Sequence, residues 1–164
     1  MKNILLDTNI YGLALERKEI ANIMIYFAEE KLRADKKYFI SGFKVINDEI
    51  NAVPHRETRT RLIELYNAVI SGEIKISDSI KSLALDYFNE CKKERARITL
   101  EDCQIVAAGC VANVKYIVTD NRKTMRSPRS MDIFNSINKR KNLRTPEFMG
   151  YEQLKSFLLS SGVS

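Results

Sequence analysis

The sequence has few of the residues that mark disordered, fibrous or membrane-spanning proteins. Only 3 of the 164 residues are proline and 6 are glycine, which excludes a collagen-like or low-complexity chain. Gly109 and Asn113 interrupt the longest apolar run, so no stretch approaches the roughly 18 residues of a membrane span. The apolar start before Asp7 is too short for a secretory signal. We therefore predict a soluble, cytoplasmic protein that has no membrane partner.

Cysteine and histidine are also scarce, which argues against a zinc site and a disulfide framework. Cys91, Cys103 and Cys110 show no paired spacing, and the single histidine, His55, lies far from them in the sequence. Cys103 and Cys110 are seven positions apart on one expected helix and share a face. We expect these cysteines to fill the core as free thiols, which suits a reducing compartment.

Positive charge is concentrated in one part of the chain. The whole sequence has 27 basic and 21 acidic residues, a net charge of +6. The stretch 115–144 alone contains nine basic residues and two acidic ones, a net charge of +7. Such a local positive field favours polyanions, above all nucleic acid. A solvated loop in a basic protein has the same composition, so both interpretations stay open.

Short apolar runs alternate with helical patterns along the chain. Buried strands are predicted at 3–6, 37–41 and 116–118, with a short extended piece at 74–76. Helices are predicted from about residue 10 and at 18–32, 43–52, 58–70, 79–95, 99–114 and 151–159. This alternation predicts an α/β fold with a mainly parallel central sheet. No repeat or long linker divides the chain, so residues 1–164 are interpreted as one domain.

Two acidic residues follow expected strands directly. Asp7 ends the first strand, and Asp120 comes just after the strand at 116–118. Parallel sheets bind ligands beyond the carboxyl ends of their strands, so these carboxylates converge if the two strands are neighbours. Capping of the next helix explains an aspartate at either position equally well.

Two further carboxylates lie on expected helices. Glu49 sits at the rim of the apolar face of its helix, whereas Asp48 points nearly opposite. Asp102 lies in the first turn of a helix that Thr99 opens, where it can complete a capping box. That helix is apolar nearly all round, so its amino end is expected near the strand ends, with Asp102 beside the same crevice and Glu101 exposed.

Clustered carboxylates repel one another and persist together where a cation compensates them. Oxygen ligands without Cys or His favour Mg²⁺ or Mn²⁺ over zinc. Such an ion beside a basic stretch suits phosphodiester cleavage, because the metal activates a water and stabilises charge on the phosphate. The residues therefore predict metal-dependent chemistry on a nucleic acid.

In their order and spacing, these features resemble the PIN-domain family. The resemblance rests on Leu5-Leu6-Asp7-Thr8-Asn9, Glu49, Asp102 with the small-residue stretch 105–108, and Ile117-Val118-Thr119-Asp120-Asn121, with a looser echo at 145–148. It implies a Rossmann-like α/β/α sandwich whose acidic quartet binds Mg²⁺ or Mn²⁺ and hydrolyses single-stranded RNA. Many PIN domains are the toxins of VapBC toxin–antitoxin pairs. RNA and an antitoxin protein are therefore the expected partners, and the sequence leaves open whether the protein is a homodimer.

The resemblance also assigns roles to individual residues. The catalytic and metal-binding carboxylates would be Asp7, Glu49, Asp102 and Asp120. The family pattern Thr-x-Asp puts Asn121 where the last acid belongs, so Asn121 is the alternative to Asp120. Thr119 would orient that last acid. The expected substrate-binding residues are Thr8, Asn9, Thr119, Asn121, Arg122, Lys123, Arg126 and Arg129. A basic C-terminal segment at about 122–149 is longer than a compact toxin carries, which leaves a toxin and an RNA-processing nuclease both open.

Two other functions agree with parts of the sequence. Asn121, an amide at a position where the family pattern has an acid, favours a non-catalytic, nucleic-acid-binding protein with the PIN fold. A phosphoryl-accepting α/β domain would use Asp7 as its nucleophile. In that class, however, Asn9 stands where a second acid is usual, and the basic segment has no role. Metal-dependent cleavage separates the nuclease from the binding protein, and acid-labile phosphate on Asp7 would identify the third class.

Overall fold

Parallel strands form one sheet in the computed structural model, which describes residues 2–29 and 37–162. The strands are β1 (Lys2–Leu6), β2 (Tyr38–Phe43), β3 (Gly72–Ile74), β4 (Tyr116–Val118) and β5 (Glu147–Met149). Every neighbouring pair is parallel, and the order is β3-β2-β1-β4-β5. The strand order therefore reverses between β1 and β4, which is where an open parallel sheet binds its ligands.

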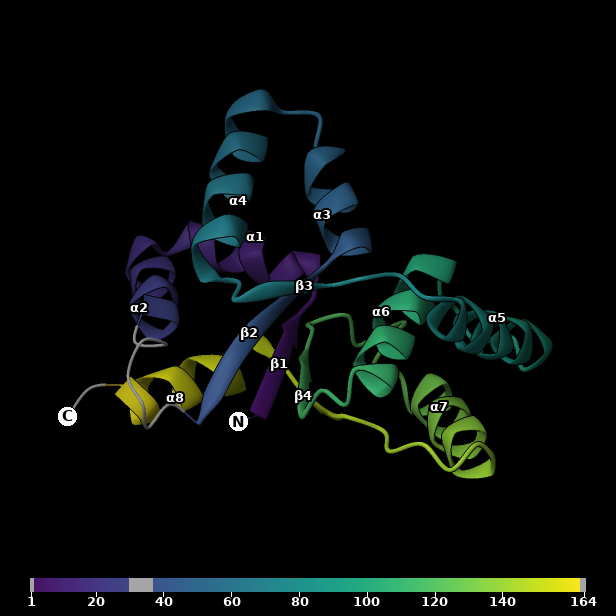
Figure 1. Cartoon of the computed structure of the whole chain (residues 1–164). Coiled ribbons are helices and arrows are strands. Elements are labelled where there is room, and N and C mark those ends of the chain that lie inside the picture. Colours follow the sequence, from purple (N-terminus) through teal and green to yellow (C-terminus); the bar gives the residue numbers. More distant parts are fainter. Residues whose placement is uncertain (1, 30–36, 163–164) are drawn as a thin grey trace.

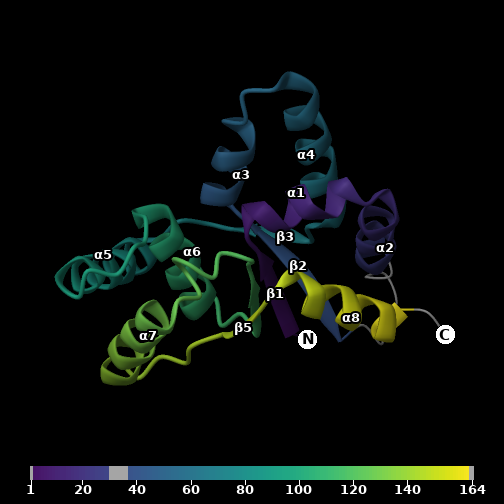
Figure 2. The same cartoon turned by 180° about the vertical axis from the view of Figure 1, so that it is seen from behind.

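Helices cover both faces of this sheet. They are α1 (Thr8–Glu16), α2 (Lys18–Glu29), α3 (Lys44–Asn51), α4 (Arg56–Val69), α5 (Asp78–Lys93), α6 (Leu100–Val111), α7 (Pro128–Arg140) and α8 (Tyr151–Gly162). In Figure 1, α5, α6 and α7 pack together on one side, and α2, α4 and α8 lie on the other side with α1. Figure 2 shows the same division from behind, with α8 in front. The predicted α/β/α sandwich is confirmed.

The central strand explains why the sheet is covered on both faces. Ile4, Leu5 and Leu6 of β1 are fully buried, as expected for a strand between two helical layers. On one side, α6 packs directly on β4, because a Cβ added to Gly109 would lie 2.6 Å from the Ile117 side chain. Since β1 and β4 are neighbours, the residues that follow them meet at one edge.

Several predicted boundaries need correction. The first helix begins at Thr8 and not near Ile10, because Asp7 already caps it. The extended piece expected at 74–76 is a strand over Gly72–Ile74, paired with β2. The last residues of the helix expected at 18–32 lie outside the described residues. The largest omissions are β5 and α7, and α7 occupies much of what was expected to be a basic loop.

The three cysteines are buried and unpaired, as predicted. Cys110 belongs to a buried polar network that fixes α7 to α5 and α6. The Tyr87 hydroxyl donates to Asn138 Oδ1 and lies 3.3 Å from the Cys110 sulfur. The Asn138 amide donates to Thr145 Oγ1 at 2.9 Å. In the described part of the chain, no helix is long and apolar enough to cross a membrane.

Candidate active site

Asp7 lies where the chain leaves the central strand. Its backbone N–H donates to Val118 O on β4 at 2.9 Å. This bond holds Asp7 at the edge of the sheet where the parallel strands end, which we call the carboxyl edge. Oδ1 accepts from the Thr8 N–H at 2.8 Å, and Oδ2 accepts from the Thr119 hydroxyl at 2.7 Å. Asp7 is only 5% exposed. Asp7 therefore caps α1 and also lies at the candidate site. Thr119, expected to orient the last acid, donates instead to the first, because β4 lies beside β1.

Glu49 reaches the same edge from α3. It is half-buried, and its Oε2 accepts from the hydroxyl of Thr8, the residue next to Asp7. Asp48, one position earlier, is exposed and forms an ion pair with Lys44 at 2.9 Å. The rim position that helical periodicity predicted for Glu49 is therefore confirmed.

Asp102 approaches from the amino end of α6. Its Oδ2 accepts from the Thr99 N–H at 3.5 Å, and its own N–H donates to Thr99 Oγ1 at 3.1 Å, so the predicted capping box is present. Oδ2 also accepts from the Thr124 hydroxyl at 3.4 Å. Glu101 is exposed, as predicted. Sequence reasoning missed Thr124, because no local pattern indicates which helix end its loop contacts.

The electrostatics join these three carboxylates into one cluster. Burial raises the pKa of Asp7, and the charge of Asp102 raises it further against the opposing effect of the Thr119 hydrogen bond. Burial likewise raises the pKa of Glu49, with contributions from Asp7 and Asp102. The pKa of Asp102 is raised by burial above all. Three carboxylates that disfavour their own ionised forms can be compensated by a cation or by protons.

The fourth expected acid faces another element. Oδ1 of Asp120 accepts from the backbone N–H of Tyr151 at 2.8 Å and so holds the start of α8. The Asp120 N–H donates to Asn9 Oδ1 at 3.5 Å, and the Asn121 N–H donates to the Thr119 hydroxyl at 3.1 Å. That Asp120 completes the site, with Asn121 as the alternative, stays a prediction.

The four basic residues expected at the substrate separate into two pairs. Arg126 Nη1 donates to Thr119 O at 3.2 Å, and Arg129 Nη1 donates to the carbonyl of Glu94 at 3.0 Å. Arg122 and Lys123 are exposed, and their side chains form no hydrogen bond or ion pair with the described residues. Arg122 and Lys123 therefore have their whole charged groups available to a ligand, whereas Arg126 and Arg129 each use one guanidinium nitrogen on a main-chain carbonyl and keep the others.

The donor chemistry at this edge fits a hard divalent cation, because its ligands are carboxylate oxygens. As the side chains stand, however, no three Asp, Glu, His or Cys residues within 2–29 and 37–162 form a group that could hold a metal. Direct coordination by all three acids would therefore require their side chains to draw closer.

Comparison with known proteins shows the fold and no closer relationship. No protein-family model and no curated protein matches the sequence. VapBC2 from Rickettsia felis, bound to a DNA fragment from its promoter, matches with a TM-score of 0.59 and 15% identity over 90% of this chain and 98% of that chain. DNA-bound VapBC from Salmonella typhimurium matches with a TM-score of 0.59 and 14% identity over 92% and 99%.

VapBC-1 from nontypeable Haemophilus influenzae is similar too, with a TM-score of 0.56 and 17% identity over 92% of this chain and 98% of that chain. Identities this low carry no residue roles, but matches that span nearly the whole of both chains define the architecture. The protein therefore has the fold of these VapBC structures, in agreement with the fold that its resemblance to the PIN-domain family implies.

Proposed function

We propose that this protein is a metal-dependent ribonuclease that hydrolyses phosphodiester bonds in single-stranded RNA. A fold alone does not determine an activity, so the proposal rests on the site. The observation that carries it is the convergence of Asp7, Glu49 and Asp102, from three separate elements, at the edge where the strand order reverses. Burial raises the pKa values of all three, and the charge of Asp102 raises those of Asp7 and Glu49 further, a condition common at functional sites.

The proposed cofactor is Mg²⁺ or Mn²⁺, held by Asp7, Glu49 and Asp102 with Asp120 or Asn121 as the fourth ligand. When bound, such an ion supplies an activated water and stabilises negative charge on the phosphate. The chain's own contribution is positioning, since the hydroxyls of Thr8, Thr119 and Thr124 each donate to one of the three acids. Arg122 and Lys123, exposed beside this edge, are proposed to contact the RNA backbone.

The test is cleavage of a labelled single-stranded RNA in EDTA, Mg²⁺ or Mn²⁺. Glu49→Gln is compared with Asp48→Asn, which removes the same charge from the exposed face of the same helix. We expect cleavage only with metal, and a loss of about 100-fold or more in Glu49→Gln alone. Metal-independent cleavage, or equal activity in the two variants, would contradict the proposal.

A non-catalytic nucleic-acid-binding protein is the second candidate. It is favoured by the hydrogen bond of Asp120 to the start of α8 and by Asn121 at the family's acidic position. This candidate predicts oligonucleotide binding without cleavage in either metal, and binding that Glu49→Gln leaves unchanged.

An antitoxin protein is the proposed partner, with the cytoplasm as the proposed compartment. The support is the shared fold with the VapBC structures. A toxin should arrest growth when expressed, and the arrest should be relieved both by Glu49→Gln and by co-expression of a small protein encoded next to its gene. Unimpaired growth would favour an RNA-processing nuclease instead.

A further inference from the structure

The opposite edge of the sheet, where the strands begin, carries a row of cations. The Lys2 N–H donates to Lys37 O at 2.7 Å, so the main chains of these two lysines are neighbours at the starts of β1 and β2. The Lys115 N–H donates to Asn3 O at 2.8 Å, which puts Lys115 on the other side of β1. The three lysines therefore follow the sheet order β2-β1-β4.

A fourth cation extends the row. Arg144 Nη2 donates to Val114 O at 3.1 Å, beside the start of β4. Lys2, Lys37 and Arg144 are exposed, and Lys115 is half-buried. Glu147 is the one acidic residue among the described residues that begin these strands or lead into them. It forms an ion pair with Lys115. We call these four basic residues the amino-edge row.

Aromatic rings support two of these lysines. The rings of Tyr38 and Tyr116 stack with centroids 6.4 Å apart and an interplanar angle of 30°. Lys2 Nζ lies 5.7 Å from the centroid of Tyr38, and Lys115 Nζ lies 5.4 Å from that of Tyr116. Cation–π contacts restrain both ammonium groups, which lowers the entropy cost of binding an anion there.

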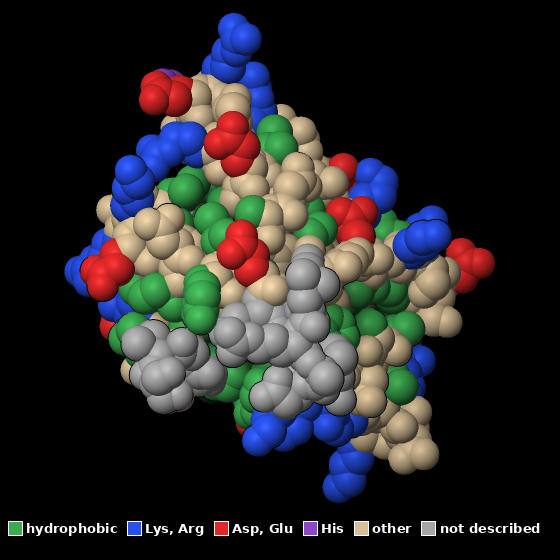
Figure 3. Space-filling model, turned by 60° about the vertical axis from the view of Figure 1, so that its left-hand side comes forward, with side chains coloured by type: hydrophobic (Ala, Val, Ile, Leu, Met, Phe, Trp, Pro, Cys, Tyr) green, Lys and Arg blue, Asp and Glu red, His purple; other side chains and the backbone are tan. Residues whose placement is uncertain are grey.

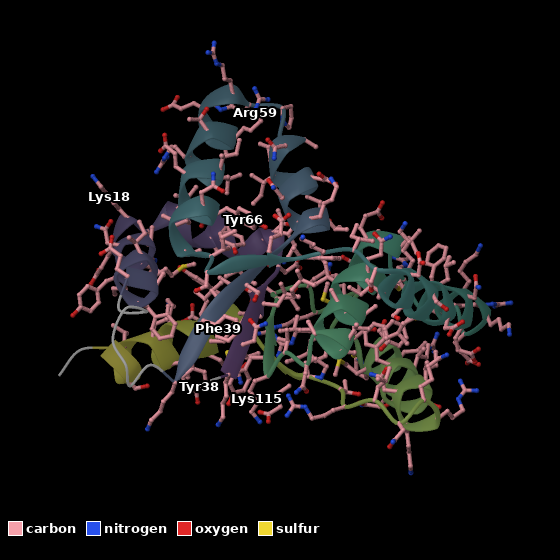
Figure 4. All side chains as sticks on the ribbon, viewed as in Figure 1. Lys18, Tyr38, Phe39, Arg59, Tyr66 and Lys115 are labelled. Carbon is pink, nitrogen blue, oxygen red and sulfur yellow. The ribbon has the colours of Figure 1, made fainter. Side chains whose placement is uncertain are left out.

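The surface views agree with this placement. Figure 3 shows blue side chains gathered at the lower edge of the molecule, the edge at which β1 begins in Figure 1. Figure 4 shows Tyr38 and Lys115 at this lower end of the sheet, far from Tyr66 and Arg59 above it.

We propose that the amino-edge row binds the phosphate backbone of single-stranded nucleic acid. Neighbouring strands are about 4.8 Å apart, so the backbones that carry the four cations span roughly 15 Å along this end of the sheet, enough to meet several phosphates of one strand. Positively charged surfaces that follow the phosphate backbone are a usual way in which proteins bind single strands without sequence preference. The proposal also assigns a phosphate-binding role to Lys115 and Arg144, which belong to the basic stretch 115–144 but lie away from the carboxylates.

This surface is separate from the carboxylate cluster. β1 runs from Lys2 to Leu6, and a strand rises about 3.3 Å per residue, so roughly 15 Å separates the row from Asp7. Binding there requires neither metal nor cleavage, and the proposal is therefore independent of the ribonuclease activity.

The test is fluorescence anisotropy with a labelled single-stranded DNA of about 20 nucleotides in EDTA. The double variant Lys2→Ala/Lys37→Ala is compared with Lys18→Ala/Lys81→Ala, which removes the same charge from exposed positions on α2 and α5. Each lost phosphate contact lowers the log–log salt slope by about 0.7, so the first variant should lose about 1.4 and bind at least several-fold more weakly. The control should retain the slope.

A second variant should act in the opposite direction. Glu147→Gln removes the carboxylate that pairs with Lys115, so binding should tighten by about twofold to fivefold. Equal slopes in the two double variants, or weaker binding by Glu147→Gln, would overturn the proposal. So would binding of anionic lipid vesicles or acidic peptides in place of the oligonucleotide. Because the probe is DNA in EDTA, a failure of the proposed ribonuclease would leave this result interpretable.

Discussion

The two edges of the sheet carry opposite charges in opposite surroundings. At the carboxyl edge, Asp7 is buried, Glu49 and Asp102 are half-buried, and the pKa values of all three are raised. At the amino edge, Lys2 and Lys37 are exposed, and solvent screens them. Buried charges of one sign reduce the free energy of unfolding unless a ligand compensates them, whereas exposed ones cost little. The difference is what the two proposals require, a small cation at the carboxyl edge and an extended anion at the amino edge.

The largest expected effect comes from Asp7→Asn at the carboxyl edge. Asparagine can still cap α1, but it removes one buried negative charge. We expect RNA cleavage to fall by about 100-fold or more while the melting temperature in EDTA holds or rises, because repulsion is relieved. Cleavage kinetics and calorimetry check both parts. An unfolded Asp7→Asn variant would show that Asp7 is a structural cap alone.

Thr119→Val should have the next largest effect. The hydroxyl of Thr119 donates to Asp7 and accepts from the Asn121 N–H, so its loss frees the first acid to rotate. Residues that orient metal ligands typically contribute 10-fold to 100-fold to affinity. We therefore expect the Mg²⁺ concentration for half-maximal activity to rise by about tenfold. The matched change Thr145→Val, which removes a hydroxyl near α7, should leave that concentration unaltered.

The basic residues beside the carboxyl edge should show a smaller effect. Arg122→Ala/Lys123→Ala removes two exposed cations, so KM for RNA should rise a few-fold and the log–log salt slope should fall by about 1.4. Arg126→Ala instead removes a guanidinium that holds Thr119 O, and we expect it to lower kcat and stability more than the salt slope. The reverse pattern would place the RNA path along Arg126.

The smallest expected effect is on stability as a function of pH. The folded-state pKa of Asp7 is raised above its ordinary value of 3.8, so its contribution to stability is full below that value and is lost as pH rises through the folded pKa. Glu49 and Asp102 behave in the same way. Without metal, Asp7→Asn should therefore gain most over the natural protein near pH 7.5, and the gain should shrink as the pH falls towards 3.8.

Calorimetry in EDTA at several pH values measures this difference. Added Mg²⁺ should stabilise the natural protein more at pH 7.5 than at pH 5, since binding needs ionised carboxylates. A melting-temperature difference that is constant across this range would show that the pKa of Asp7 is not raised in the folded protein.

Local patterns were enough to predict much of the carboxyl edge. Helical periodicity separated Glu49 from Asp48, and the spacing of Thr99 and Asp102 predicted the capping box. Asp7 and Asp120 were placed at strand ends from their positions alone. These predictions succeeded because each depends on residues within a few positions of one another, where the repeat of a helix or strand determines orientation.

Other features were missed although a signal was present. Ser127 and Pro128 are a typical helix start, and Ser127 does cap α7. The concentration of basic residues there led to the prediction of a solvated or RNA-binding loop. In the structure the apolar face of α7, with Ile133, Phe134 and Ile137, packs into the core.

The sequence by itself determined most of the elements, several capping residues and the acidic and basic character of particular segments. Only the tertiary structure decided that Thr119 serves Asp7, that one oxygen of Asp120 holds α8, and that Lys37, Lys2 and Lys115 form a row. These outcomes depend on the strand order β2-β1-β4 and on its register. Strand pairing joins segments that are distant in the chain, so it is selected by the packing of the whole core and not by any local repeat.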